Sequence, residues 1–416
     1  MLEVYSYRMQ GDSTNKDGGR QPEAVTRTQR DTIWSMPYVV LMAANFFQSM
    51  AAFMVNTTMP VYLDSLGATT SMVGIVVGAF AITALLIRPF AGPAFDSFSR
   101  KRLLIIAQAF IAVSLVGYGV VDNIPALFLV RLIHGIGIGC SGPLGMSLVS
   151  EFLPTSKLAS GISIYALAQS FAQVIGPAVG LWLAESVGFS NAYFLAASSV
   201  AVAMVGVMFC KEPPRDRLPY KFALNRMFAR EAVAKAGVLC LLAIAFSGVT
   251  SYFVLYGQLL GIESLGTYFV VYALCLVATR PLFGKLADRF GAPRVLLVGI
   301  MFFAASYVLL WRVRDFAGIM VVAVVGSAGF GACAPLIQSM ALGSVPLERR
   351  GAASNTAFTG LDLGTLVGPA TAGFVIEALV PVTGGVIPAY STMWLVMLIP
   401  LACAFAVILY WNIRRS

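Results

Sequence analysis

Ionisable side chains are scarce inside the apolar stretches of this 416-residue chain, so those that occur there are the residues best placed to do chemistry. Asp362 is the one acidic residue deep within such a stretch, about ten residues and ~15 Å from its end. A carboxyl group in a low-dielectric setting can bind and release a proton near neutral pH, which makes Asp362 the first candidate for proton coupling. The alternative is a structural aspartate that hydrogen-bonds a helix end or a nearby Ser or Thr.

Arg131 and His134 lie three positions apart and therefore share one face of a helix. An arginine inside a membrane is costly and normally faces a cavity or a partner, and a histidine titrates in the useful pH range. The pair could bind a substrate or, through His134, handle protons. The alternative is an arginine bonded to backbone carbonyls beside a buried neutral histidine.

Uncharged polar and aromatic side chains within the apolar stretches are further candidates to line a substrate cavity. Tyrosines could stack on a solute, although they could equally form an interfacial belt. The candidates are Asn45, Gln48, Asn56, Gln169, Gln173, Gln338, Asn355, Tyr252 and Tyr256.

The elements that must position these residues are transmembrane helices. Apolar residues make up 58% of the chain and charged residues 11%, against about 25% in soluble domains. This balance argues against a cytosolic enzyme and against a nucleic-acid binder, despite the net charge of +9. Continuous apolar stretches of this length must be helices in lipid, which predicts an all-α integral membrane protein. The predicted spans are 36–62, 72–95, 102–121, 125–149, 159–185, 191–210, 236–259, 265–286, 294–312, 316–343, 351–379 and 389–411.

Basic residues predict the orientation of these twelve spans. Of the 28 Lys and Arg residues, 23 lie on the side that carries both termini and only two in the opposite loops. The positive-inside rule therefore places both termini in the cytoplasm of a cell whose plasma membrane holds the chain. The expected organisation is a cytoplasmic tail (1–35), a six-helix bundle (36–210), a basic linker (211–235), a second six-helix bundle (236–411) and a short cytoplasmic tail (412–416).

The two bundles repeat one another at a constant offset of 192 residues. Arg88-Pro89 recurs as Arg280-Pro281, and Gly176-Pro177 recurs as Gly368-Pro369. A duplicated unit with both copies in one orientation predicts two bundles related by an axis along the membrane normal, with the site between them near the midplane.

At these motifs the chain resembles the major facilitator superfamily over residues 36–411. The signature loop after the second helix is matched in part by Gly92, Asp96 and Arg100, and more fully by Gly284, Asp288, Arg289 and Arg294. Arg131 with its glycine-rich run resembles the helix 4 signature. Gly176, Pro177 and Gly180 resemble an exporter signature in helix 5, which Gly364, Gly368, Pro369 and Gly373 copy in helix 11. The resemblance implies a twelve-helix transporter of the proton-coupled efflux branch.

Charges at the cytoplasmic helix ends could form a gate. Asp96 and Asp288 face basic loop residues, and a charge pair there could tie the bundles together and lock one access state. The alternative is simple positive-inside topology with turn glycines. Arg88 and Arg280 recur in both halves, which favours a structural role for them over a unique substrate contact.

The most consistent function is secondary active transport by alternating access, with export of a small amphipathic compound or metabolite in exchange for protons. The main alternative is a proton-coupled uptake symporter that holds an anionic solute on Arg131. A membrane enzyme would need a catalytic constellation that one histidine and one deep aspartate do not supply, and no phosphate-binding loop indicates a primary pump. The single His134 and six scattered cysteines predict no metal site, and we expect no cofactor and a monomer.

Overall fold

The computed structural model describes residues 32–154, 158–212, 219, 228–346 and 349–415, and all regular structure in these ranges is helical. Within them, twelve stretches are long and apolar enough to cross a membrane, which confirms the predicted spans. The first half holds α1 (Met36–Ser65), α2 (Thr70–Gly78), α3 (Phe80–Ser97), α4 (Arg100–Val120), α5 (Ile124–Ser150), α6 (Leu158–Val187) and α7 (Phe189–Phe209). The second holds α9 (Arg230–Leu259), α10 (Gly266–Phe290), α11 (Ala292–Arg312), α12 (Phe316–Leu342), α13 (Arg350–Thr383), α14 (Val386–Val396) and α15 (Leu398–Arg415).

The helix boundaries differ from the predicted ones in two ways, through interruptions within spans and through an earlier helix start. Two spans expected to be continuous are interrupted, one at Ala79 between α2 and α3 and one at Met397 between α14 and α15. In addition, α9 begins at Arg230, so the predicted linker 211–235 is too long at its end. Apolar length alone cannot show a helix that continues past its apolar stretch. The tail 1–31 and most of the linker (213–218 and 220–227) lie outside the described residues.

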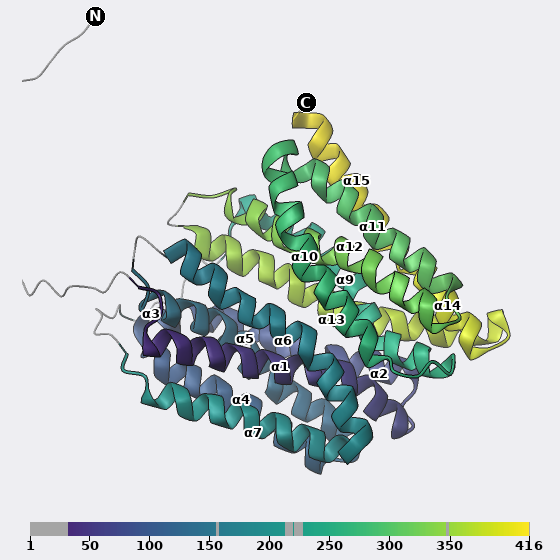
Figure 1. Cartoon of the computed structure of the whole chain (residues 1–416), viewed down its shortest axis with the longest axis horizontal. Helices are drawn as coiled ribbons and strands as arrows, with labels where there is room; N and C mark the ends of the chain where they lie inside the picture. The colour runs from purple at the N-terminus through teal and green to yellow at the C-terminus, as the bar shows by residue number, and fades with distance from the viewer. Residues whose placement is uncertain (1–31, 155–157, 213–218, 220–227, 347–348, 416) are drawn as a thin grey trace, which may run out of the picture.

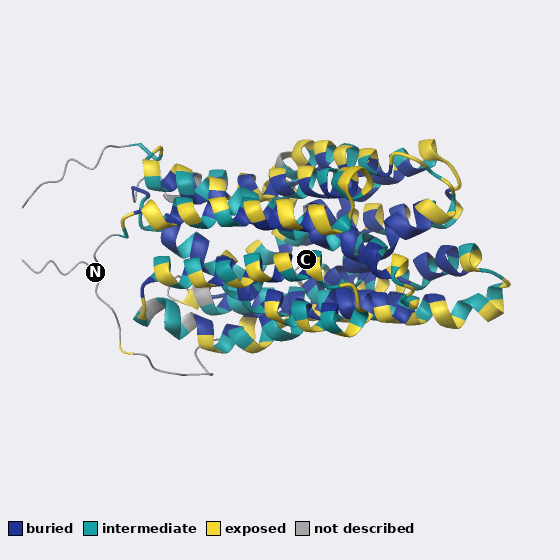
Figure 2. Ribbon diagram, turned by 90° about the horizontal axis from the view of Figure 1, so that it is seen from below, coloured by how far each residue is buried: buried dark blue, intermediate teal, exposed yellow. Residues whose placement is uncertain are grey.

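The outer faces of the helices are apolar where they are exposed. Leu86, Val113, Val202 and Leu274 each expose more than 60% of their surface. In Figure 2 exposed residues lie along the outer sides of the helices, and buried residues lie between the helices. A water-soluble protein rarely exposes so much contiguous apolar surface, whereas lipid covers it without cost.

The two halves lie side by side and approach most closely at one end (Figure 1). We call this end the distal side, and the end that carries the start of α1 and the linker the tail side. On the distal side α2 crosses α13 so tightly that a side chain at Gly74 would overlap the Pro369 carbonyl, and one at Gly373 would overlap that of Thr70. The Tyr252 hydroxyl donates a 2.6 Å hydrogen bond to that Thr70 oxygen from the other half. Toward the tail side the ribbons of the halves diverge (Figure 1).

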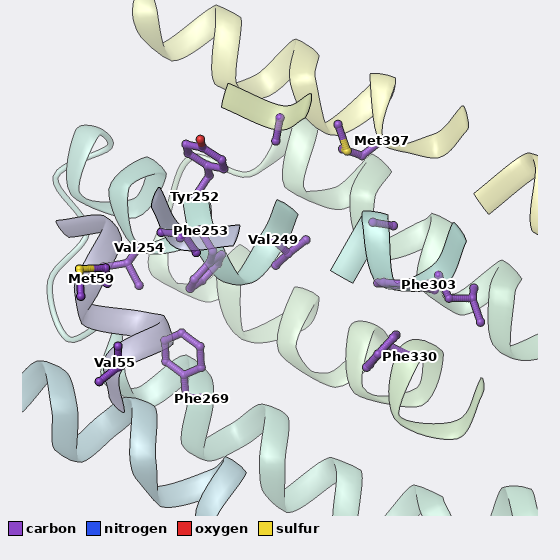
Figure 3. Packing of buried hydrophobic residues seen from close by; sticks show 14 of the residues in the cluster. Val55, Met59, Val249, Tyr252, Phe253, Val254, Phe269, Phe303, Phe330 and Met397 are labelled. Atoms are coloured by element: carbon purple, nitrogen blue, oxygen red, sulfur yellow. The ribbon is translucent and has the colours of Figure 1, made fainter. Parts of the chain in front are cut away.

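An apolar core continues across the junction of the halves on the distal side. Figure 3 shows Val55 and Met59 of α1 next to Val254 of α9 and Phe269 of α10, all within one buried cluster. Burial of these side chains and the glycine crossing together hold the halves closed at that end. α3, which carries Arg88, continues from α2 on the tail side of this closure.

Candidate functional site

A buried ion pair joins the two halves near the middle of the bundle. Arg88 of α3 places its Nε 2.6 Å from Oδ2 of Asp362 on α13. Both side chains are about nine-tenths buried, at 9% and 12% exposure. The guanidinium also lies over the ring of Phe358, with 5.2 Å to the ring centroid. A charged pair at this depth is costly unless both members are present, so each residue fixes the state of the other.

The sequence around Asp362 explains why this carboxylate faces the other half. Gly360, Gly364 and Gly368 form one stripe of α13, and a side chain at any of them would overlap the backbone of α9. Small residues at this spacing let two membrane helices pack closely. Asp362 lies two positions from Gly360 and Gly364, so it points away from α9 and toward α3. The glycines predicted for helix packing therefore also orient the acid.

A second inter-half contact occupies the equivalent place in the repeat. Arg280 of α10 donates a 2.5 Å hydrogen bond from Nη1 to Oγ of Ser170 on α6. Arg280 follows Arg88 by the repeat offset of 192 residues, and Asp362 follows Ser170 by the same number. The two contacts are thus the same crossing built twice, once with a carboxylate and once with a hydroxyl.

Arg131 is engaged inside the first half. Its Nη2 donates to Oδ1 of Asn56 at 2.8 Å, and Nε and Nη2 reach the carbonyl of Val77 at 3.2 and 3.0 Å. That carbonyl lies at the end of α2, where the interruption before Phe80 leaves it free to accept. The guanidinium also covers the Phe80 ring at 4.7 Å. Arg131 therefore braces the break between α2 and α3 against α1.

His134 shares the helix face of Arg131 but has a different neighbour. Its Nδ1 lies 3.0 Å from the hydroxyl of Tyr118, and the ring is 2% exposed. Tyr118 packs in turn on Tyr193, which places the histidine in the interior of the first bundle. Its Nε2 has no hydrogen-bond partner among the described residues. The structure therefore brings His134 and Arg131 together with the bundle core, and does not bring either one to Asp362.

Comparison with known proteins decides the family. The sequence pattern of the Major Facilitator Superfamily matches residues 41–275 and 261–416. The chain belongs to this superfamily of membrane transporters.

Several relatives of this transporter are named for export or resistance. Staphylopine export protein of Staphylococcus aureus is 26% identical over 261 residues, which cover 59% of this chain and 64% of that protein, less than two thirds of its length. Quinolone resistance protein NorA of S. aureus is 23% identical over 78% of this chain and 86% of its own. Multidrug resistance protein 1 of Bacillus subtilis is 23% identical over 81% of this chain and 89% of its own.

Solved structures show the same fold. A bacterial homolog of the human lysosomal transporter Spinster, in an inward-facing and unoccupied conformation, matches with a TM-score of 0.76 at 14% identity, over 89% of this chain and 95% of that one. The nucleoside transporter NupG matches with a TM-score of 0.68 at 15% identity, over 90% and 98%. These likenesses confirm the predicted twelve-helix, two-bundle architecture of the superfamily.

The remaining polar candidates divide between helix contacts and accessible positions. Asn45 donates to the carbonyl of Tyr165 at 3.3 Å, and Gln48 donates to Oγ of Ser141 at 2.7 Å, so both join helices within the first half of the transporter. Gln169 is exposed, whereas Gln173, Gln338 and Asn355 are half-buried. The exposed amide of Gln169 lies next to Ser170, beside the second crossing.

The tyrosines predicted to line a cavity are instead fully buried in the second half. Tyr252 makes the distal contact with Thr70, and Tyr256 lies 3.0 Å from Oγ of Ser391 and accepts from Arg314 at 2.8 Å. Neither tyrosine is exposed to a measurable extent. Sequence alone could not separate a cavity-lining tyrosine from one that packs between helices.

An aromatic cavity does exist in the second half, enclosed by α9, α10, α11 and α12. Its lining includes Phe253, Tyr268, Tyr272, Phe303 and Ser306. The volume of about 40 Å³ is far below the ~300–1,000 Å³ of sites for drug-sized ligands. It is therefore a packing feature of this bundle and does not hold a whole substrate of that size.

The predicted tail-side gate residues do not bridge the halves where they are described. Arg100 pairs with Glu151 at 2.7 Å, and both belong to the first half. Asp288, Arg289 and Arg294 are exposed, and Gly284 faces open space. The side chains of Gly92 and Asp96 lie outside the described residues. Among the described residues, the ion pair of Arg100 lies within the first half, and the tail-side gate stays a prediction.

Some residues that join the halves were not among the candidates predicted from the sequence. They include Ser170, which meets Arg280, and Ser71, which hydrogen-bonds the carboxylate of Glu377 at the distal rim. Applying the 192-residue offset to Asp362 would have indicated Ser170, whereas nothing in the sequence indicates Ser71. Among the described residues, no cluster of His, Cys, Asp and Glu could hold a metal ion.

Proposed function

We propose that this transporter exports a small organic solute in exchange for protons, and that the Arg88–Asp362 pair is the site of proton coupling. The observation that carries the proposal is a buried carboxylate that binds an arginine of the opposite half. Protonation of Asp362 removes the charge that holds Arg88. Because Arg88 belongs to the other half, protonation is linked to the relative position of the halves.

Export is supported by the relatives named for export and drug resistance, whose alignments cover most of this chain in two cases. The distribution of basic residues supports cytoplasmic termini in a plasma membrane. With that orientation the tail side is the cytoplasm and the distal side the exterior. The structure is then inward-facing, because its halves are closed on the distal side and diverge on the other.

The charge states of the pair define a cycle. We assign an ionised Asp362 to the 2.6 Å pair with Arg88, so the inward-facing state is the one from which a proton has left. A protonated Asp362 cannot neutralise Arg88, and the cost of an uncompensated buried charge, about 3–5 kcal/mol, favours separation of α3 from α13. Gain and loss of this proton therefore change which relative position of the halves is favoured.

The proposed cycle uses no cofactor and no metal, and it breaks no bond of the solute, so we propose a transporter and not an enzyme. Both members of the ion pair belong to one chain, so the proposed cycle needs only a monomer. In this proposal the polar residues between the halves bind the solute in a space that opens to one side of the membrane and then to the other. Protons are the second ligand.

The test uses everted membrane vesicles from cells that overproduce the protein, loaded to be acid inside. A panel of compounds, beginning with a quinolone, is screened for accumulation that depends on the protein. We expect accumulation that collapses when the pH gradient is dissipated. Asp362→Asn abolishes this accumulation and retains exchange of labelled for unlabelled solute, whereas Asp122→Asn, an exposed acid far from the pair, behaves as the wild type.

Two results would contradict the proposal. Accumulation in right-side-out vesicles with acid outside would indicate the uptake alternative. A normal pH-driven accumulation by Asp362→Asn would remove Asp362 from the coupling, and His134 would be tested next. A reporter fused after Ser416 checks the orientation, and activity of that reporter only outside the cell would overturn it.

A further inference from the structure

The crossing of α10 with α6 repeats the α3–α13 crossing, but it lacks a carboxylate at the position of Asp362. Arg280 takes the place of Arg88, and Ser170 takes the place of Asp362, at the same repeat offset. The contact again joins the two halves, since α6 belongs to the first and α10 to the second. The repeat therefore conserves the arginine, the helix pair and the contact, and changes only the group that the arginine meets.

The positive charge of Arg280 is left without a carboxylate among the described residues. Its Nη1 donates to a neutral hydroxyl, and its Nε is buried with no hydrogen-bond partner in the described part of the chain. The one acid deep within a span, Asp362, is already held by Arg88. On α10 itself, Asp288 is exposed and lies eight residues away, roughly 12 Å along the helix.

A half-buried guanidinium whose Nε is buried without a hydrogen-bond partner among the described residues is an incomplete site. Arginine inside a membrane protein is normally paired or faces a cavity, because its desolvation is expensive. The planar fork of donors fits a carboxylate, which can accept from two nitrogen atoms at once. A neighbouring serine hydroxyl can donate a further hydrogen bond to the same anion.

We propose that Arg280 and Ser170 form a subsite for the carboxylate group of the transported solute. The bound carboxylate would occupy the charge position that Asp362 fills at the other crossing. The solute would then contact both halves, as the Arg88–Asp362 pair does. This assignment rests on the proposed transport function and specifies its substrate class, an organic anion.

The same donors could instead hold an inorganic anion such as chloride, and the test separates the two sources. The purified full-length protein, in detergent and in a buffer free of chloride and carboxylates, is titrated with benzoate, acetate, citrate, chloride and the neutral benzyl alcohol. Thermal unfolding and calorimetry report binding. We expect at least one carboxylate to raise the unfolding temperature, and benzyl alcohol and chloride to have no comparable effect.

Variants assign that binding to the subsite. Arg280→Gln is expected to weaken carboxylate binding by about 10-fold or more, because a charge-assisted hydrogen bond is lost. Ser170→Asp is expected to weaken it similarly, since the internal carboxylate takes the place of the ligand. The matched control is Arg312→Gln, an exposed arginine stacked on Trp311 outside the inter-half region, which should bind as the wild type.

Three outcomes would overturn the subsite. They are the absence of binding by all three carboxylates, equal binding by Arg280→Gln, and stabilisation by chloride alone. Asp362→Asn should still bind the carboxylate in detergent. If this variant loses proton-driven transport and keeps carboxylate binding, both the subsite and the coupling proposal are supported. Binding without any proton-driven transport by the wild type would contradict the proposed function and leave the subsite standing.

Discussion

The α3–α13 and α10–α6 crossings are equivalent in the repeat, but they differ in the side chain that meets the arginine. Arg88 meets the carboxylate of Asp362, whereas Arg280 meets the hydroxyl of Ser170. The difference extends to the distal rim. There Ser71 hydrogen-bonds Glu377 at the first crossing, while the equivalent positions at the second are Glu263 and Glu185, both exposed acids.

The two crossings also differ in how closely the backbones of their helices approach each other. A Cβ atom at Gly74 would overlap the Pro369 carbonyl, but a Cβ atom at Gly266, its repeat equivalent, would lie 3.7 Å from the Cα of Ala178. The α2/α3–α13 crossing is thus tight, and its arginine is paired with a carboxylate, whereas the α10–α6 crossing is looser, and its arginine meets a hydroxyl. Under our two proposals, the unequal crossings of a repeated scaffold serve different functions, proton binding at the first and solute binding at the second.

The largest expected effect comes from removing the charge pairing at the first crossing. Asp362→Asn should reduce pH-driven transport by about 100-fold or more, because Arg88 is left as an uncompensated buried charge. The double variant Arg88→Gln with Asp362→Asn should regain thermal stability and yet remain uncoupled, as measured by solute accumulation in vesicles. Restored coupling in the double variant would show that the pair is only structural.

Ser170→Asp tests the comparison from the other side by giving the second crossing the charge pairing of the first. Transport of the solute should fall by about 10-fold, since Arg280 is then neutralised within the protein. Ser170→Ala removes one hydrogen bond, from the Arg280 guanidinium to an uncharged hydroxyl, and should change transport by less than about 5-fold. Transport by Ser170→Asp at the wild-type rate would contradict an unequal role for the two crossings.

Matched glycine variants test the difference in tightness. Gly74→Ala should shift the population toward the outward-facing state by about 10-fold, because overpacking at the α2–α13 crossing costs roughly 1–3 kcal/mol. Gly266→Ala should leave the population unchanged, since its Cβ atom makes only ordinary contacts. Spin labels at the repeat-equivalent exposed positions Phe98 and Phe290 report the separation of the halves on the tail side. Equal distance distributions for the two variants would contradict the proposed difference in packing between the two crossings.

The smallest effect is expected at the tail-side gate. Asp288→Asn should slow transport by about 2- to 5-fold with near-normal expression, since an exposed charge pair contributes at most about 1 kcal/mol. Its effect should appear in the outward-facing state, in which the tail side is closed. Kinetics equal to those of the wild type in reconstituted vesicles would show that the gate pairing is dispensable.

Much of this architecture follows from the sequence because it depends on local properties. Continuous apolar length predicts the spans, and the 192-residue offset predicts the two bundles. The site follows less well, because partners such as Arg88 and Asp362 are 274 residues apart and meet only through the crossing of their helices. Periodicity cannot give that crossing, which depends on the fit of the glycine stripe of α13 against α9.

Arg131 shows the same limit in another form. The sequence identifies an intramembrane arginine, and it leaves open whether the side chain faces a solute or backbone carbonyls. The deciding feature is the helix interruption at Ala79, which frees the Val77 carbonyl. The apolar stretch around it predicts an unbroken helix, so the acceptor of Arg131 cannot be foreseen.

Difference infrared spectroscopy of the purified protein on a step in pH tests most directly whether the carboxylate of the first crossing carries the proton. The carbonyl band of a protonated, buried carboxylic acid should appear in the wild type as the pH is lowered and be missing from Asp362→Asn. It should remain in Arg280→Gln and Ser170→Ala, because neither of these substitutions removes a carboxyl group. Persistence of the band in Asp362→Asn, or its absence from the wild type, would contradict the account.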